Sequence, residues 1–171
     1  MNRFLGRMGL TGAVIMCVIV LFVGGAQAER KKISGTDKVG PPISETSVLP
    51  GDVANHRLLL TVRRDTTKSA DPEFNDTELM EYQQIDDSAT GGVHKVYFRR
   101  FFKNGDTLYG QSEGASKVSA KGDGTNEITW EGKWQVTGGT GKFKSIKGSG
   151  TYRGKVTKEG AFTDWEGEVE Y

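Results

Sequence analysis

Two groups of side chains in the C-terminal two-thirds of the chain could take part in chemistry on a small molecule. The first is ionisable or polar and comprises Arg100, Glu113 and Tyr82. A carboxylate and a cation around one ligand could orient it and stabilise charge that develops on it. The second is a set of large aromatic residues, Phe98, Trp130, Trp134, Tyr152 and Trp165. Aromatic walls with a few polar groups are typical of sites for apolar or aromatic small molecules.

Both groups also have an ordinary structural interpretation. Charged residues in strands are mostly exposed, and aromatic rings in a small barrel can form its core. Small residues at Gly110, Ser112, Gly114 and Ser116 could instead leave a pocket opposite the rings. The sequence therefore leaves open whether the interior is filled or hollow. It predicts a ligand site at Phe98, Arg100, Glu113, Trp130, Trp134, Tyr152 and Trp165, and it assigns no catalytic residue.

Short alternating runs separated by glycine-containing turns must position these residues, and no amphipathic helix of useful length appears. Turns at Asn104-Gly105-Asp106 and Lys158-Glu159-Gly160 are typical of tight hairpins. This pattern predicts consecutive antiparallel strands. We expect strands over residues 56–64, 79–86, 93–103, 107–120, 126–137, 148–157 and 161–170.

Alternation is clearest in residues 128–136, where even positions are apolar or glycine and odd positions are polar. Residues 161–171 repeat it with the odd positions apolar. One face of each strand therefore enters a core. Gly132 and Gly167 lie in these inward rows, where a missing side chain permits bending or close packing. The prediction is an all-β fold, an antiparallel closed β-barrel of about seven to eight strands.

The strand over residues 93–103 departs from simple alternation. Val96, Phe98 and Phe102 occupy one face, and Val93, Tyr97 and Phe101 occupy the other. In a monomeric barrel the outer row would leave aromatic rings in solvent. We therefore expect contact with another subunit, with coverage by the N-terminal leader as the alternative.

The glycine-rich segment over residues 136–150 is a poor match to a phosphate-binding loop. Phe143 follows Lys142, where a P-loop has Ser or Thr to hold magnesium, and strand-like sequence returns by Ser149. Gly148, Gly150 and Gly154 do not open a βαβ unit either. A structural corner explains the segment better, because glycines permit left-handed backbone and Phe143 can fold inward as a plug. The predicted turn residues are Gly138, Gly139, Gly141, Phe143 and Gly148.

The segment that begins with Gly138-Gly139-Thr140-Gly141-Lys142-Phe143 and ends at Gly148 resembles the corresponding turn of the dirigent and allene oxide cyclase barrel superfamily. Gly105-Asp106-Thr107-Leu108 is similar to the hairpin before it, and the resemblance runs over roughly residues 93–156. It implies an antiparallel barrel of about eight strands around an apolar cavity, commonly in trimers. No catalytic residue of that group can be matched individually to this chain.

The N-terminus is typical of a secretory signal. Arg3 and Arg7 precede an apolar run over residues 10–23, and small residues at Ala26 and Ala28 favour cleavage after Ala28. The run has 14 residues, fewer than the roughly 20 needed to span a bilayer. We expect a signal peptide over 1–28, a flexible leader over 29–55 with a short edge strand near 43–48, and a barrel domain over 56–171. The signal predicts secretion or export to a periplasm.

Composition excludes several function classes. Without residues 1–28 the chain keeps 21 basic residues of its 23, because Arg3 and Arg7 are lost, against 22 acidic ones, so its formal charge is −1 and it has no cysteine. Nucleic-acid binding normally needs a basic surface. Thiol catalysis and cysteine-rich zinc sites need cysteine. His56 and His94 are the only histidines, so we expect no metal, no cofactor, no nucleic-acid partner and no stable membrane insertion after signal removal.

Three functions remain open. A secreted or periplasmic barrel could bind an apolar or aromatic small molecule in its lumen without chemistry. It could instead be a cyclase-like or dirigent-like steering protein for a reactive intermediate, as the resemblance implies. It could also act only through its surface, as a structural or interaction protein. A lumen smaller than roughly 300 Å³ would favour the third, and buried convergent ionisable groups would favour the second.

Overall fold

The computed structural model describes residues 30–122 and 124–171, which form nine strands and one short 3-10 helix. The predicted signal peptide, residues 1–28, lies outside them. Among the residues described, no helix is long and apolar enough to cross a membrane. The elements are β1 (Arg30–Lys38), β2 (Pro42–Val48), β3 (Arg57–Lys68), β4 (Glu78–Ser88), β5 (Gly91–Phe101), β6 (Thr107–Ala120), β7 (Asn126–Gly139), η1 (Gly141–Phe143), β8 (Lys147–Thr157) and β9 (Gly160–Glu170).

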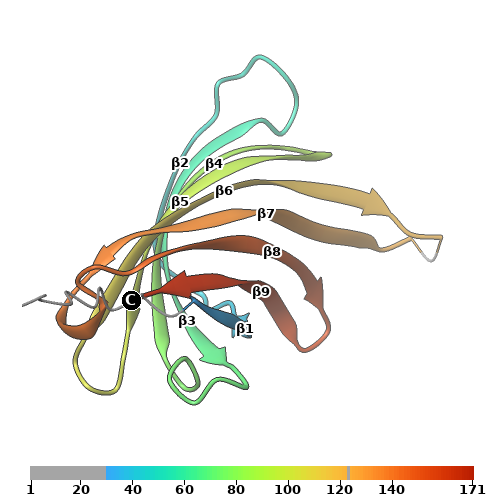
Figure 1. Cartoon of the computed structure of the whole chain (residues 1–171). Helices are drawn as coiled ribbons and strands as arrows, with labels where there is room; N and C mark the ends of the chain where they lie inside the picture. The colour runs from blue at the N-terminus through green and yellow to red at the C-terminus, as the bar shows by residue number, and fades with distance from the viewer. Residues whose placement is uncertain (1–29, 123) are drawn as a thin grey trace, which may run out of the picture.

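All strands belong to one antiparallel sheet in the order β1-β9-β8-β7-β6-β5-β4-β3-β2. An additional pairing of β1 with β3 joins Thr36–Lys38 to Thr66–Lys68 and closes the ring. Eight of the nine strands therefore lie in the ring, and β2 extends the free edge of β3 beyond the seam. Figure 1 shows the sheet curling round on itself, with the C-terminus beside the β5–β6 and β7–β8 connections. The predicted all-β antiparallel barrel is confirmed.

Two of the nine strands come from the segment that was expected to be a flexible leader. β1 pairs with β9 along its whole length, from Arg30 opposite Glu170 to Lys38 opposite Phe162. β2 is exposed at every position and pairs with β3. Neither strand shows strong local alternation of apolar and polar residues. Each is instead defined by its backbone partner in the sheet, which is β9 for β1 and β3 for β2. The leader therefore supplies the strand that closes the barrel.

The alternation of apolar and polar residues sets which side chains face inward. In β7 the even positions from Trp130 to Val136 are partly buried while the odd positions Glu131, Lys133 and Gln135 are exposed. In β9 Trp165 and Val169 are buried between exposed acidic residues. Inward and outward rows thus follow the pleat of each strand.

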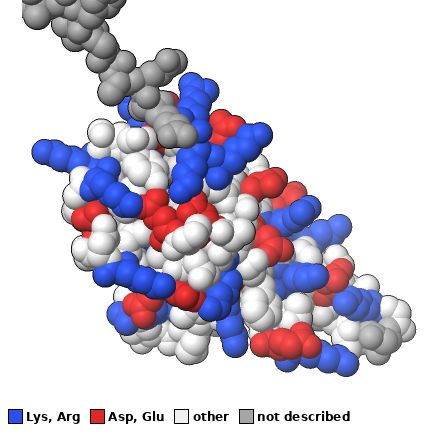
Figure 2. Space-filling model, turned by 60° about the horizontal axis from the view of Figure 1, so that its bottom comes forward, with Lys and Arg blue, Asp and Glu red and all other residues white. Residues whose placement is uncertain are grey.

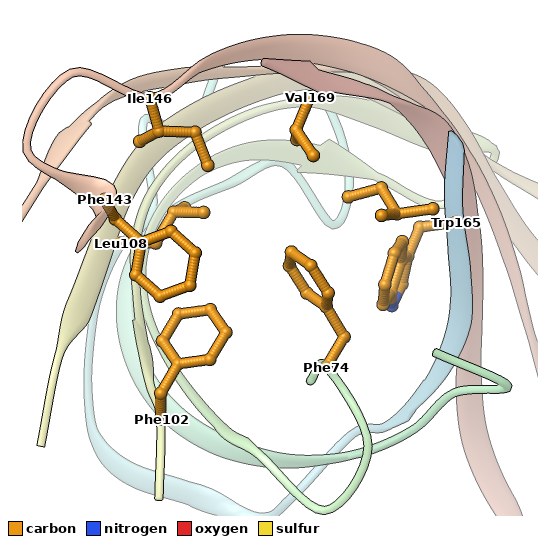
Figure 3. Close-up of a cluster of buried hydrophobic side chains, with 8 residues drawn as sticks. Phe74, Phe102, Leu108, Phe143, Ile146, Trp165 and Val169 are labelled. Atoms are coloured by element: carbon orange, nitrogen blue, oxygen red, sulfur yellow. The ribbon is translucent and has the colours of Figure 1, made fainter. Parts of the chain in front are cut away.

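A hydrophobic plug closes one end of the ring. It is formed by side chains from loops as well as strands, and Figure 3 shows their rings converging inside the sheet. Phe143 from η1 is fully buried and packs against Phe102, with ring centroids 4.2 Å apart. Phe74, from the β3–β4 loop, meets Phe102 edge-on at 5.4 Å. The other members are Ile33, Leu108, Ile146, Trp165 and Val169.

The corner between β7 and β8 forms the plug as its glycines predict. Gly138 and Gly141 have positive φ angles of 151° and 53°, which favour glycine. Gly139 is needed for space instead, since a Cβ there would lie 2.6 Å from the Phe143 Cβ. A Cβ at Gly148 would lie 2.6 Å from the Glu168 carbonyl oxygen. A side chain at Gly139 would therefore displace Phe143 from beneath the end of β7.

The outer face carries charges of both signs. Figure 2 shows Lys and Arg interspersed with Asp and Glu over the face in view. On β5 the outward row is apolar in part, with Val93 59% and Tyr97 45% exposed, and Tyr97 is paired with the exposed Tyr82 of β4. The pattern of two apolar faces on this strand is therefore present in the structure. Contact of the outer row with another subunit stays a prediction.

Candidate functional site

The barrel encloses a cavity of about 340 Å³ above the hydrophobic plug. This volume lies within the range of sites for small molecules. Six of the seven predicted ligand-site residues line it: Phe98, Arg100, Trp130, Trp134, Tyr152 and Trp165. The seventh, Glu113, is exposed and does not line it. Tyr82, the other polar candidate, is 40% exposed and also points away.

The lumen is hollow because its aromatic rings lie flat against the wall over glycines. Gly154 is paired with Trp130, and a Cβ there would overlap the indole ring. Gly150 is paired with Trp134 and Gly167 lies one strand further, and a Cβ at either glycine would collide with the same indole. Removing Cβ atoms from the wall gives each ring a place outside the central space. The rings therefore line the cavity without filling it.

The same arrangement recurs on the other strands. A Cβ at Gly110 would overlap the ring of Phe98, its cross-strand partner. A Cβ at Gly35 of β1 would lie 2.5 Å from the Trp165 ring, again across a paired position. Each of these inward aromatic residues thus faces a glycine on a neighbouring strand.

A buried ion pair forms one polar part of the cavity wall. Arg100 of β5 and Asp37 of β1 are 6% and 4% exposed, and Arg100 Nη2 lies 3.2 Å from Asp37 Oδ2. The second guanidinium nitrogen donates to the hydroxyl oxygens of Thr67 and Thr77. Asp37 also accepts a hydrogen bond from Thr67. This network fixes Arg100 with its guanidinium 5.0 Å from the Trp165 ring centroid.

Two carboxyl groups beside this pair hold protons far more strongly than usual. Burial, reinforced by the charge of Asp37, raises the pKa of Asp65 to about 7, although a hydrogen bond from the Gly40 backbone N–H opposes the rise. Burial raises the pKa of Glu81 to about 8, and the charges of Asp65 and Asp37 add to the effect. The positive charge of Arg63 lowers both pKa values, but it offsets only part of the rise. A raised pKa near neutrality suits a carboxylic acid to proton donation.

A third polar group lies on the wall that runs from β5 to β8. His94 Nε2 and Tyr152 Oη are 2.6 Å apart, and both residues line the cavity. Burial lowers the pKa of His94. Burial raises the pKa of Tyr152 to about 12, with a hydrogen bond from Ser112 opposing the rise. At neutral pH the phenol is therefore protonated and lies within hydrogen-bond distance of a neutral imidazole.

Sequence reasoning missed Glu81, Asp65 and His94 as site residues. The parity of β4 contained a usable signal, because Glu81 lies in the same row as Leu79 and Ile85, all of which line the cavity. Tyr82 belongs to the opposite row, which explains its outward position. The parity of β5 contained the same signal for His94, which shares a row with Val96 and Phe98, although it was not among the expected ligand-site residues.

The residues present do not form a metal centre. Within residues 30–122 and 124–171, no group of three or more His, Cys, Asp or Glu side chains is arranged to hold a metal ion. The site offers carboxylic acids, a guanidinium, a phenol–imidazole pair and aromatic rings. Such groups can bind an aromatic ligand and transfer protons to and from it.

No protein-family model matches the sequence, and no curated protein matches it significantly. The fold matches the solved structure of a pterocarpan synthase dirigent protein with a TM-score of 0.52 and 12% identity, over 86% of this chain and 98% of that one. A second pterocarpan synthase dirigent protein gives a TM-score of 0.48 and 14% identity, over 92% and 97% of the two chains. The first likeness confirms, at the level of the fold, the resemblance to dirigent barrels.

Proposed function

We propose that the barrel binds a small aromatic molecule in its lumen and guides its cyclisation, with Glu81 as the proton donor. The observation that carries this proposal is the Glu81 carboxyl group on the wall of an aromatic-lined cavity, with the buried Asp65 carboxyl group near it. Their pKa values of about 8 and about 7 keep a large part of each group protonated near neutral pH. A carboxylic acid in that range transfers protons effectively in general acid catalysis.

The shape and polarity of the cavity support an aromatic ligand. Its wall is mainly apolar, and its volume of about 340 Å³ accommodates a small molecule. The indole N–H groups of Trp134 and Trp165 are buried and have no hydrogen-bond partner in the described part of the chain. Buried donors of this kind lose free energy unless they find an acceptor. A ligand that carries hydroxyl or ether oxygens would supply one.

The fixed position of Arg100 supports steering of a developing negative charge. Its donors are taken up by Asp37, Thr67 and Thr77, so the guanidinium does not reorganise when a ligand enters. Preorganised charge of this kind stabilises a transition state without a further rearrangement. The dirigent protein of the same fold is a pterocarpan synthase by name, which agrees with a synthetic role for such a lumen.

Binding without chemistry is the alternative that the same cavity permits. A carrier needs the apolar wall but has no use for carboxyl groups that remain protonated at neutral pH. Desolvating these groups destabilises their charged forms and thereby opposes their burial in the wall. The presence of Glu81 and Asp37 on the cavity wall, with Asp65 buried near them, therefore favours proton transfer over simple carriage.

The test begins with native mass spectrometry of the protein purified from its own compartment. We expect a retained small molecule with an aromatic absorption spectrum. That molecule or its open-chain precursor is then incubated with the wild type and with Glu81→Gln and Asp65→Asn, and the products are separated by chromatography. Conversion by the wild type that falls at least tenfold in Glu81→Gln supports the proposal. If the protein retains a ligand that neither the wild type nor either variant converts, the protein is a carrier and the catalytic part of the proposal is refuted.

Export is part of the same proposal. A ligand of this kind would be met outside the cytoplasm if residues 1–28 act as a cleaved signal. The mature protein is then expected to begin at Glu29. Intact mass measurement of the protein from its native host checks the cleavage site, and a mass that includes residues 1–28 would contradict it.

A further inference from the structure

The backbones of Tyr152 and Glu81 lie on opposite sides of the ring, and His94 lies on β5, the strand beside that of Glu81. Tyr152 is on β8 and Glu81 is on β4, and these strands are separated by three strands in either direction around the eight-stranded ring. Both residues line the same cavity. Their electrostatic coupling agrees with this placement, because the charge of Glu81 contributes to the raised pKa of Tyr152. A ligand in the cavity would therefore meet both the Glu81 carboxyl group and the phenol–imidazole pair.

The pairing of the strands explains how the Tyr152 side chain reaches His94. The two residues belong to one cross-strand row, in which Tyr152 is paired with Gly132, Gly132 with Gly114, and Gly114 with His94. A Cβ at Gly114 would lie 2.5 Å from the Tyr152 hydroxyl oxygen, and a Cβ at Gly132 would collide with it as well. The tyrosine side chain therefore crosses two strands over a floor of glycine and ends on the imidazole.

We propose that the Tyr152–His94 pair is the proton acceptor of the lumen and takes a proton from a hydroxyl group of the bound ligand while Glu81 donates one to another atom of the same ligand. This inference rests on the proposed function, which supplies the acid, and it adds the base. It commits the ligand to a class, hydroxylated aromatic compounds that also carry an electrophilic double bond. It also commits the reaction to an isomerising cyclisation.

The step balances within the ligand. The hydroxyl proton passes to Tyr152 Oη as the phenolic proton passes to His94 Nε2, and the electron pair left on the ligand oxygen forms a C–O bond to the electrophilic carbon. The π electron pair displaced from that carbon takes the proton of Glu81. The ligand loses one proton and gains one, so its composition is unchanged. Proton return from His94 to the Glu81 carboxylate through solvent restores the site without an oxidant or a reductant.

A structural role for the same hydrogen bond makes a different prediction. If the bond only holds Tyr152 in place, its loss changes stability but not the protonation state of a bound phenol. If the pair accepts protons, a phenol bound beside it is ionised to a greater extent than the same phenol in water. The ionisation of a bound chromophore therefore distinguishes the two roles.

The experiment uses 4-nitrophenol as the probe, with the mature protein, at a pH near the pKa of the free phenol. Quenching of tryptophan fluorescence reports binding near Trp130, Trp134 and Trp165, and visible absorption reports the phenolate. We expect binding to raise the phenolate-to-phenol ratio about tenfold, which corresponds to one pKa unit. Tyr152→Phe and His94→Gln are expected to bind the probe and lose this increase. Tyr82→Phe, on the outer face, is the matched control and is expected to behave as the wild type.

The outcomes separate the inference from the proposed function. Absence of probe binding to the lumen overturns both. Binding with no increase in phenolate, or an increase that persists in Tyr152→Phe, overturns the base while leaving the aromatic site in place. Circular dichroism establishes that each variant is folded. Tyr152→Phe decides the result if His94→Gln does not fold, because it removes one oxygen and leaves the ring over its glycines.

Discussion

The hydroxyl of Tyr152 reaches His94 Nε2 at 2.6 Å across two intervening strands, because the wall between them carries glycine at both crossing points. In an ordinary β-sheet, side chains on Gly132 and Gly114 would block this contact. The relationship links sequence to function in a direct way. Because Gly132 and Gly114 have no side chain, the phenol ring of Tyr152 can lie against the sheet. The space in front of the ring then remains open as a cavity beside the Tyr152–His94 pair.

The glycine floor predicts a specific stability change. Gly132→Ala places a Cβ against the Tyr152 hydroxyl and the Glu113 carbonyl oxygen. We expect the free energy of unfolding, measured by urea denaturation, to fall by about 1–3 kcal/mol. Gly122→Ala is the matched control, because its Cβ would meet nothing within 4 Å. Equal effects of the two substitutions would contradict the role assigned to the floor.

The rows that carry Trp130, Trp134 and Trp165 could be predicted because local alternation fixes which face of a strand is inward. β6 has the bounds that its pattern predicts, Thr107–Ala120. The closing strand could not be predicted in this way. In β1 only Ile33 and Asp37 are buried, and its partners on β9 lie more than a hundred residues away. Local sequence contains little information about such pairing.

The acidic part of the site was missed for a related reason. A glutamate in a strand is normally exposed, and the pKa of Glu81 is raised only because the side chain is desolvated near Asp65 of the adjacent strand β3 and Asp37 of β1. The resulting environment is a property of the closed ring. Row parity can indicate that Glu81 faces inward, but neither its pKa nor its partners can be read from β4 alone.

The raised pKa values of Glu81 and Asp65 predict how stability depends on pH. A carboxyl group whose pKa is higher in the folded state binds protons more tightly there than in the unfolded chain. Its contribution is complete below the unfolded pKa and is lost as pH rises through the folded pKa. The windows run from 4.5 to about 8 for Glu81 and from 3.8 to about 7 for Asp65.

We therefore expect the free energy of unfolding to decrease between pH 5 and pH 9, which urea denaturation at several pH values measures. His56, whose pKa is raised by Asp52 and Asp86, acts in the same direction. The difference between the wild type and Glu81→Gln isolates the glutamate, because His56 is present in both. A variant as pH-dependent as the wild type would show that Glu81 ionises normally in the folded protein.

The plug predicts a large effect at Phe143, which is fully buried between Phe102 and Tyr171. Phe143→Ala removes a ring from a packed cluster, and we expect a loss of about 3–5 kcal/mol in the free energy of unfolding. Leu49→Ala, at a position 71% exposed, serves as the control and should change it little. A loss below about 1 kcal/mol at Phe143 would mean that the barrel end is stable without its plug.

The exposed apolar row of β5 predicts self-association. If a second copy covers Val93 and Tyr97, sedimentation velocity of the wild type will show a species larger than the monomer. Tyr97→Arg is expected to dissociate it, since a buried unpaired charge at an interface is unfavourable. Ser149→Arg places the same charge on an outward position of β8 and should leave the assembly intact. A monomeric wild type would refute the prediction.

The buried ion pair of Arg100 and Asp37 predicts a non-additive response. Arg100→Met leaves the Asp37 carboxylate buried without its cation, and Asp37→Leu does the reverse. Each is expected to lower the free energy of unfolding by about 3–5 kcal/mol, whereas the double variant should lose far less than the sum, because neither charge then remains. The exposed pair of Arg30 and Glu170 is the control, and Arg30→Met should change stability by about 0–1 kcal/mol. Additive losses in the double variant would show that Thr67 and Thr77, and not Asp37, are the main partners that hold Arg100 in the lumen wall.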